Sequence, residues 1–188
     1  SFVPACDAAL AGEVYISPHI GEALGKFQQP PVALSSRQMA ILHYLAQGTR
    51  WWPDALPGQS SVLTWLSFEQ DRHMKPLAQL RLMLALHPGG DPQDALCLAH
   101  ARSARAALSV LDTQLARQGQ EGWVATRDHP SIADVALYPY TCMAPMGGIA
   151  LNDYPAIQAW LKRIESLPRY QALFPGQPER NLSTQEQP

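Results

Sequence analysis

The sequence predicts a mainly helical protein in two unequal parts, a short N-terminal part and an all-α part that begins near residue 60. Two observations support this prediction. After residue 60, apolar residues recur at helical spacing, and no useful stretch alternates with the period of two that is typical of half-buried strands. The segment QGTRWWPDALPGQ (47–59) is punctuated by Gly and Pro and separates two differently patterned halves, so we expect a linker there.

The elements of the helical part follow in order. The segment 60–86 is long enough to cross a domain, and Pro76 should kink it. A second helix is expected at 92–119, with Gly119 as its stop, and a shorter one at 154–170, with proline at its first position. The tail is polar and rich in Gln and Pro, so we expect it to fray.

Another helix is predicted to begin at Ser131, in the stretch HPSIADVALYPY (129–140). The Ser131 hydroxyl can accept from the amide of Asp134, and the Asp134 carboxylate can accept from the amide of Ser131, which makes a capping box with Asp in place of Glu. The apolar run that follows predicts burial, where unpaired amides would be costly. We therefore expect this pair to be structural.

Composition limits the classes of partner and location. The chain has 188 residues with 14 basic and 16 acidic side chains, without a basic cluster, so we expect no nucleic-acid and no membrane partner. The uncharged stretch 135–152 contains Pro and Gly and predicts a buried helix and a turn rather than a membrane span. Cys6, Cys97 and Cys142 are too scattered for a disulfide framework and no signal peptide precedes them, so we expect a cytoplasmic protein.

Several common chemical motifs are missing from the sequence. The six histidines show no ligand spacing such as HxxxH, so no metal site is predicted. No GxGxxG, P-loop or GxSxG pattern is present, which removes the usual nucleotide-binding and hydrolase signatures.

Two adjoining segments carry a family resemblance, WVATRDHPSIADVALYPY (123–140) and GGIALNDYPAIQAWLKRIESLP (147–168). In their order and spacing they resemble the C-terminal domain of the cytosolic glutathione transferases, bacterial type. Upstream, SRQMAILHYLAQ (36–47) is similar to the last helix of that family's thioredoxin-like domain, and VLTWLSFEQDRHMKPLAQLR (62–81) to the first long helix of its helical domain.

The resemblance implies an α+β fold of two domains and a homodimer. A thioredoxin-like, glutathione-binding domain is expected at 1–48, an all-helical domain at 58–175 and a polar tail at 176–188. The first domain is shortened, because a βαβ unit alone takes roughly 30 residues and the family adds a hairpin and a helix. Either this half has lost segments or the sequence given lacks them, and both alternatives stay open.

The resemblance also implies a group that lowers the pKa of the glutathione thiol, because the thiolate is the nucleophile. In the family this is a Tyr, Ser or Cys after the first strand, beside a helix N-terminus. FVPACDAAL (2–10) nominates Cys6, and VYISPHIGEAL (14–24) nominates Ser17, with Tyr15 as a weaker candidate. These alternatives stay open.

Other contacts to glutathione are implied in the same way. Pro31 matches the family's cis proline before the third strand, which holds the cysteinyl part of the peptide. Arg37 and Gln38 stand where the family has an acidic residue or Gln followed by Ser; they can pair with the γ-glutamyl group although they depart from that pattern. Asp71 and Arg72 match positions that reach the peptide or the neighbouring subunit, with a solvated helix face as the alternative.

Two functions therefore stay open. The first is a glutathione transferase of the detoxification type, in which glutathione is a co-substrate and its thiolate attacks a hydrophobic small-molecule electrophile. The second is a non-catalytic relative that serves as an interaction scaffold, which the shortened N-terminal half favours. We favour the transferase, because most chains with this helical domain resemble enzymes, although fold alone does not decide function.

Overall fold

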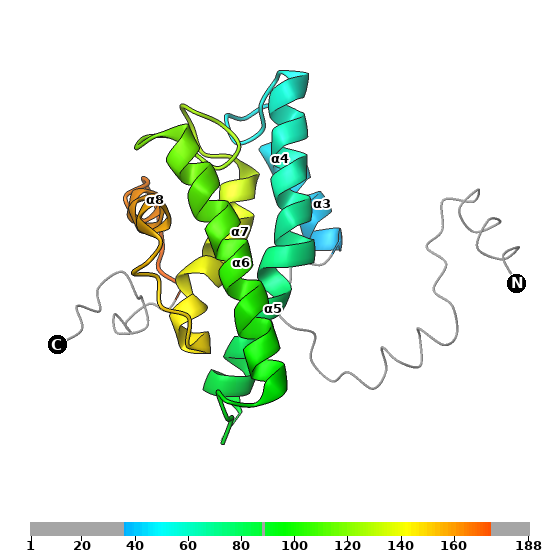
Figure 1. Ribbon diagram of the computed structural model, residues 1–188. Helices are drawn as coiled ribbons and strands as arrows, with labels where there is room; N and C mark the ends of the chain where they lie inside the picture. Colours follow the sequence, from blue (N-terminus) through cyan, green and yellow to red (C-terminus); the bar gives the residue numbers. More distant parts are fainter. Residues whose placement is uncertain (1–35, 88, 174–188) are drawn as a thin grey trace, which may run out of the picture. The chain divides into compact units, whose positions relative to one another are not determined.

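The computed structural model describes residues 36–87 and 89–173, and these form one helical unit (Figure 1). In chain order the elements are α3 (Ser36–Ala46), α4 (Leu56–Phe68), η1 (Glu69–His73), α5 (Met74–Arg81), η2 (Leu82–Leu86), α6 (Ala95–Gln118), α7 (Ile132–Cys142), η3 (Ala144–Gly147) and α8 (Pro155–Glu165). All elements of this part of the chain are helical, which confirms the all-α prediction for the second domain. Of the thioredoxin-like domain expected at 1–48, residues 1–35 lie outside the described residues, and α3 is the helix that resembles its last one.

The predicted helix at 60–86 is present but is not regular. It begins at Leu56 and runs through α4, η1, α5 and η2, in which η1 and η2 are π-helical. The sequence predicted a kink at Pro76, and the structure shows a π-helical turn just before α5, which contains this residue. Proline has no N–H to donate to the preceding turn, so a change of helical geometry at this point is expected.

The helix α6 returns antiparallel to this long run and packs against α5 (Figure 1). Its start is capped by Asp94, whose Oδ1 accepts from the amide of Leu96 at 2.7 Å. Its end is set by Gly119, which has a positive φ of 84° that suits glycine. The predicted stop at Gly119 is therefore confirmed.

The helix α7 forms the centre of the unit. Eight of its residues are buried, and it contacts α3, α4, η1, α5 and η3. Its first amide, that of Ile132, donates to the carbonyl of Trp51 at 3.1 Å, so the turn between α3 and α4 also supports the start of α7. The central helix α7 therefore holds the long helix and the turn between α3 and α4 in fixed positions.

The predicted capping box at the start of α7 is confirmed. The Asp134 carboxylate accepts from the Ser131 amide and from the Ser131 hydroxyl, both at 2.9 Å. It also accepts from the amide of Val124 at 3.0 Å and from the indole N–H of Trp160 in α8 at 2.9 Å. The box is therefore the meeting point of three segments of the chain.

Candidate functional site

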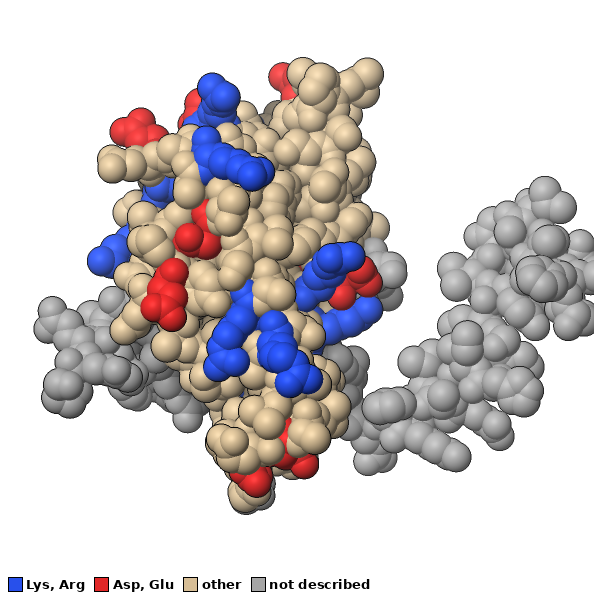
Figure 2. Space-filling view, in the orientation of Figure 1, with Lys and Arg blue, Asp and Glu red and all other residues tan. Residues whose placement is uncertain are grey.

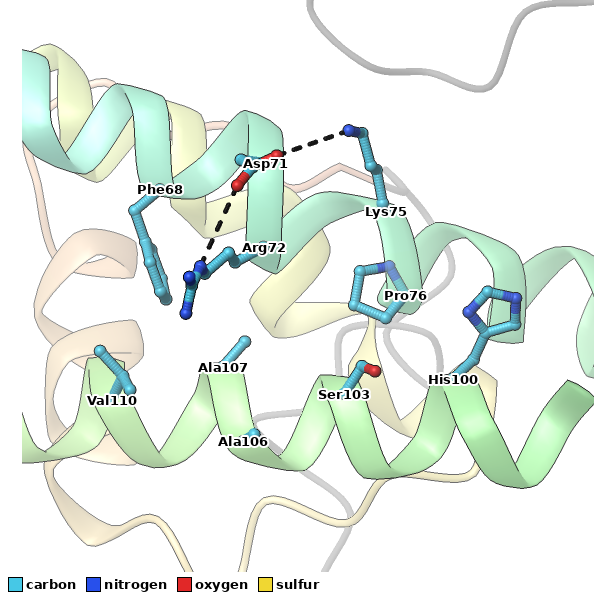
Figure 3. A pocket seen from close by; sticks show the side chains of 10 residues that line it. All are labelled: Phe68, Asp71, Arg72, Lys75, Pro76, His100, Ser103, Ala106, Ala107 and Val110. Atoms are coloured by element: carbon cyan, nitrogen blue, oxygen red, sulfur yellow. Dashed lines mark ion pairs between the residues drawn. The ribbon is translucent and has the colours of Figure 1, made fainter.

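A groove of about 580 Å³ lies between the long helix and α6 (Figure 3). We call it the α5–α6 groove; it is lined by Phe68, Asp71, Arg72, Lys75, Pro76, His100, Ser103, Ala106, Ala107 and Val110. Figure 3 shows Phe68 and Val110 at one end and His100 at the other. On the α6 side of the groove most side chains are small, and this leaves the space between α6 and the long helix open.

The charged side chains of the groove form a loose group on the long helix. The Lys75 Nζ lies 3.7 Å from Asp71 Oδ1, and the Arg72 Nε lies 4.0 Å from Asp71 Oδ2. All three side chains are more than half exposed, so each pair contributes only about 0–1 kcal/mol. Two cations against one anion leave the groove with excess positive charge.

The rest of the surface adds no strong electrostatic feature on the face that Figure 2 shows. Basic and acidic side chains are interspersed there over a large uncharged area. Among residues 36–87 and 89–173, no group of three or more His, Cys, Asp or Glu side chains is arranged to hold a metal ion. None of the helices described here is long and apolar enough to cross a membrane.

The inner side of η1 carries a buried acid. Glu69 is 1% exposed, and among the described residues its carboxylate has one side-chain partner, the Gln70 amide at 2.6 Å. Burial raises the pKa of Glu69 to about 7, and the hydrogen bond from Gln70 opposes the shift. Near neutral pH this carboxyl is therefore divided between its protonated and ionised forms.

A buried imidazole follows four residues later in the same turn. The Nε2 of His73 lies 2.9 Å from the Thr141 hydroxyl, which donates its own proton to the carbonyl of Leu137 at 2.8 Å. The hydroxyl oxygen therefore accepts, and His73 carries its proton on Nε2. Its Nδ1 is buried and has no partner in the described part of the chain, and burial lowers the pKa of His73 to about 3.

The structure brings together two of the residues nominated from the sequence. Asp71 and Arg72 lie side by side in the α5–α6 groove. Cys6, Ser17 and Pro31 lie outside the described residues. Arg37 and Gln38 belong to the first turn of α3, but their side chains also lie outside the description.

Four further residues were missed in the sequence. Lys75 stands four positions after Asp71, a spacing that places both on one helix face and could have identified it. Glu69 and His73 lie between the buried Leu66 and Leu77 at the three- and four-residue spacing of a buried helix face. Their positions therefore predict burial, although their residue types do not. Nothing local indicates His100, which reaches the groove from another helix.

Comparison with known proteins places the helical unit in a family. The model of the C-terminal domain of glutathione S-transferases matches residues 74–168, half of the chain. The chain is 30% identical to glutathione S-transferase verG of Clonostachys rogersoniana over 138 residues, which cover 71% of this chain and 56% of that relative.

Solved structures give the same result. A glutathione S-transferase from Xanthobacter autotrophicus Py2 is 33% identical, with a TM-score of 0.67 over 73% of this chain and 65% of that one. A glutathione S-transferase from Pseudomonas fluorescens Pf-5 is 36% identical, with a TM-score of 0.65 over 72% of this chain and 65% of that one. The chain thus spans less than two thirds of the length of each of these relatives.

Proposed function

Because the chain belongs to the glutathione S-transferase family, we propose that it binds glutathione and joins its thiolate to a hydrophobic small-molecule electrophile. The observation that carries the proposal is the helical domain, which matches the family model from residue 74 to residue 168 and has a continuous core. Two solved structures with the same fold and more than 30% identity are themselves called glutathione S-transferases.

The reaction requires a thiolate held beside the electrophilic carbon. The sulfur forms the new S–C bond with its own electron pair, and the leaving group departs with the electrons of the bond that breaks. Cys6 or Ser17 would lower the pKa of the thiol, while Pro31, Arg37 and Gln38 would hold the peptide. Catalysis would then come mainly from the ionised thiol and from holding both reactants together.

Two copies of the chain are proposed to pair over the α5–α6 groove, in a cytoplasmic enzyme of the detoxification type. Phe68 and Val110 supply apolar surface there, and Val110 is 50% exposed in the single chain. A two-fold pairing would place Asp71 and Arg72 opposite the partner's surface. Sedimentation near twice the chain mass of 20.7 kDa supports the pairing, and a single species at 20.7 kDa contradicts it.

Glutathione titration by calorimetry tests the proposal. Wild type is expected to give saturable heat, and Arg37→Ala to lose it, because the peptide gains most from a charged partner for its carboxylates. Arg50→Ala, an exposed arginine in the turn after α3, serves as the matched control and should bind as wild type does. Turnover lost without loss of binding in Cys6→Ala or in Ser17→Ala identifies the residue that activates the thiol.

A scaffold without catalysis is the second candidate, and the departure of Arg37 and Gln38 from the family's pattern favours it. No heat at millimolar glutathione, in a chain whose full mass has been verified, would overturn the transferase and leave this alternative.

A further inference from the structure

The π-helical turn η1 has two chemically different sides. Asp71 and Arg72 point outward into the α5–α6 groove, with their side chains 74% and 77% exposed. Glu69 and His73 point inward and are 1% and 0% exposed. One turn thus joins a solvated charged pair to two buried titratable groups.

The buried side is incompletely hydrogen-bonded. Glu69 and His73 are four residues apart in the π-helical turn, and both side chains are turned to the buried side of that turn. Because Nε2 carries the proton, the Nδ1 of His73 is an acceptor, and no donor among residues 36–87 and 89–173 reaches it. A protonated Glu69 has one O–H to donate, and its carboxyl is bonded to Gln70 in the structure, on the same side of the turn as that acceptor.

We propose that η1 is a proton-operated joint in the long helix, closed when protonated Glu69 donates to the Nδ1 of His73 and loosened when Glu69 is ionised. Closure requires the Glu69 side chain to turn from Gln70 to His73. The chain Glu69 to His73 to Thr141 to Leu137 then satisfies every donor and ties the joint to α7. Ionisation releases the proton to solvent and leaves a buried negative charge opposite a bare acceptor, which is unfavourable.

Within the described part of the chain, the groups around Glu69 do not neutralise that charge. From α7, Tyr140 faces it. Burial raises the pKa of Tyr140, Arg81 of α5 opposes that rise, and ionised Glu69 adds to it. The helix α4 has no charged residue, and the buried residues of α6 are apolar apart from Cys97. Burial, opposed by the Gln70 hydrogen bond, sets the pKa of Glu69 near 7, so the joint responds in the neutral range.

The backbone of η1 is suited to opening. The amide of Met74 donates to the carbonyl of Glu69 across the wide π-helical turn. Pro76, just beyond it, has no N–H with which to reinforce the turn. Opening at this point would move Asp71 and Arg72, so the shape of the α5–α6 groove would depend on the proton at Glu69.

Amide exchange at Met74, followed by NMR between pH 5 and 8, tests the joint without reference to the proposed activity. After correction for intrinsic exchange, wild-type protection should fall by up to about tenfold per pH unit as pH rises toward 7 and level off above it, because Glu69 binds its proton more tightly in the closed joint than in the open one up to a pKa of about 7. Glu69→Gln should stay flat, since its amide donates at every pH and does not titrate. Asp71→Asn, an acid of the same turn that faces solvent, should keep the wild-type slope.

The 15N shift of His73 Nδ1 provides an independent readout in the wild type. It should move with a midpoint near pH 7 although His73 itself stays neutral, because its donor is lost there. A constant shift from pH 6 to 8 overturns the joint even if Glu69→Gln does not fold. An equal exchange slope in wild type and Glu69→Gln overturns it as well.

Discussion

Asp134 and Glu69 are both acidic, and each is 1% exposed, yet their surroundings differ. Asp134 accepts four hydrogen bonds, from donors on Val124, Ser131 and Trp160. Within the described residues, Glu69 accepts one, from its neighbour Gln70. Burial raises the pKa of both carboxyls, but the four donors work against the rise at Asp134. The two carboxyls therefore differ in their hydrogen-bond partners rather than in burial: four donors hold Asp134 in place, and one holds Glu69.

The largest effect is expected from Asp134→Ala. Removal of the carboxylate leaves buried donors on Val124, Ser131 and Trp160 unpaired, so the free energy of unfolding should fall by about 4 kcal/mol. Urea unfolding at pH 7 measures it. The exposed neighbouring acid provides the control, since Asp128→Ala should leave the midpoint unchanged. A wild-type midpoint for Asp134→Ala would break the comparison.

A smaller effect of opposite sign is expected from Glu69→Gln. The pKa of Glu69 is raised in the folded state from 4.5 to about 7, so the folded chain binds more protons between these values and its stability falls as pH rises through 7. Gln removes this penalty, and the variant should be more stable than wild type by about 3 kcal/mol at pH 8 and by less at pH 5. Unfolding curves at both pH values measure the difference. An equal effect at the two would show that Glu69 does not titrate in this range.

The pKa shift of His73 makes stability depend on pH in the opposite direction, below pH 6.5. Its pKa is lowered in the folded state from 6.5 to about 3, so the unfolded chain binds more protons and stability is lost as pH falls below 6.5. Between pH 4.5 and 6.5 the slopes of Glu69 and His73 oppose each other. In Glu69→Gln the His73 slope is left alone, about 1.4 kcal/mol per pH unit at most. A Glu69→Gln profile that stays level from pH 6.5 to 5 would contradict this.

Ser131→Ala sharpens the comparison within the capping box. It removes one donor to Asp134 and one acceptor for the Ala133 amide, while the backbone donors remain, so the expected loss is about 1 kcal/mol. The same urea experiment applies. A loss as large as that of Asp134→Ala would mean that the hydroxyl, not the carboxylate, organises the site.

The smallest change in stability is expected when the exposed ion pair of Asp71 and Lys75 in the groove is broken. Lys75→Ala removes a contact of 3.7 Å to Asp71 in water, so stability should change by less than about 0.5 kcal/mol, and less still in high salt. A loss above 1 kcal/mol would show that the outer side of η1 also holds the fold.

The sequence predicted the parts of this picture that depend on local spacing. The capping box of Ser131 and Asp134 follows from residues three apart, and the end of α6 follows from Gly119. The contacts of Asp134 to Val124 and Trp160 join residues 10 and 26 positions apart, so local patterns do not reveal them. Glu69 was missed because a charged residue occupied a position that its spacing assigned to the core.

The groove itself was not predicted from the sequence. Asp71 and Arg72 were nominated through a family resemblance; the structure places both, exposed, on one turn of the long helix, and their role in binding stays a prediction. His100 and Ser103 come from α6, and only the packing of two helices brings them to the groove.

One matched pair of variants tests the comparison most directly, Asp134→Asn and Glu69→Gln, unfolded in urea side by side at pH 8. Each replaces a buried acid by its own amide. In wild type, Asp134 Oδ1 accepts from Val124 and Trp160, and Oδ2 accepts twice from Ser131. In Asp134→Asn the side-chain NH₂ replaces one of these two oxygens. In either orientation it therefore faces two donors, and stability should fall. In Glu69→Gln a buried charge disappears, so stability should rise. Opposite signs are the predicted result, and a change of the same sign in both variants would contradict the account.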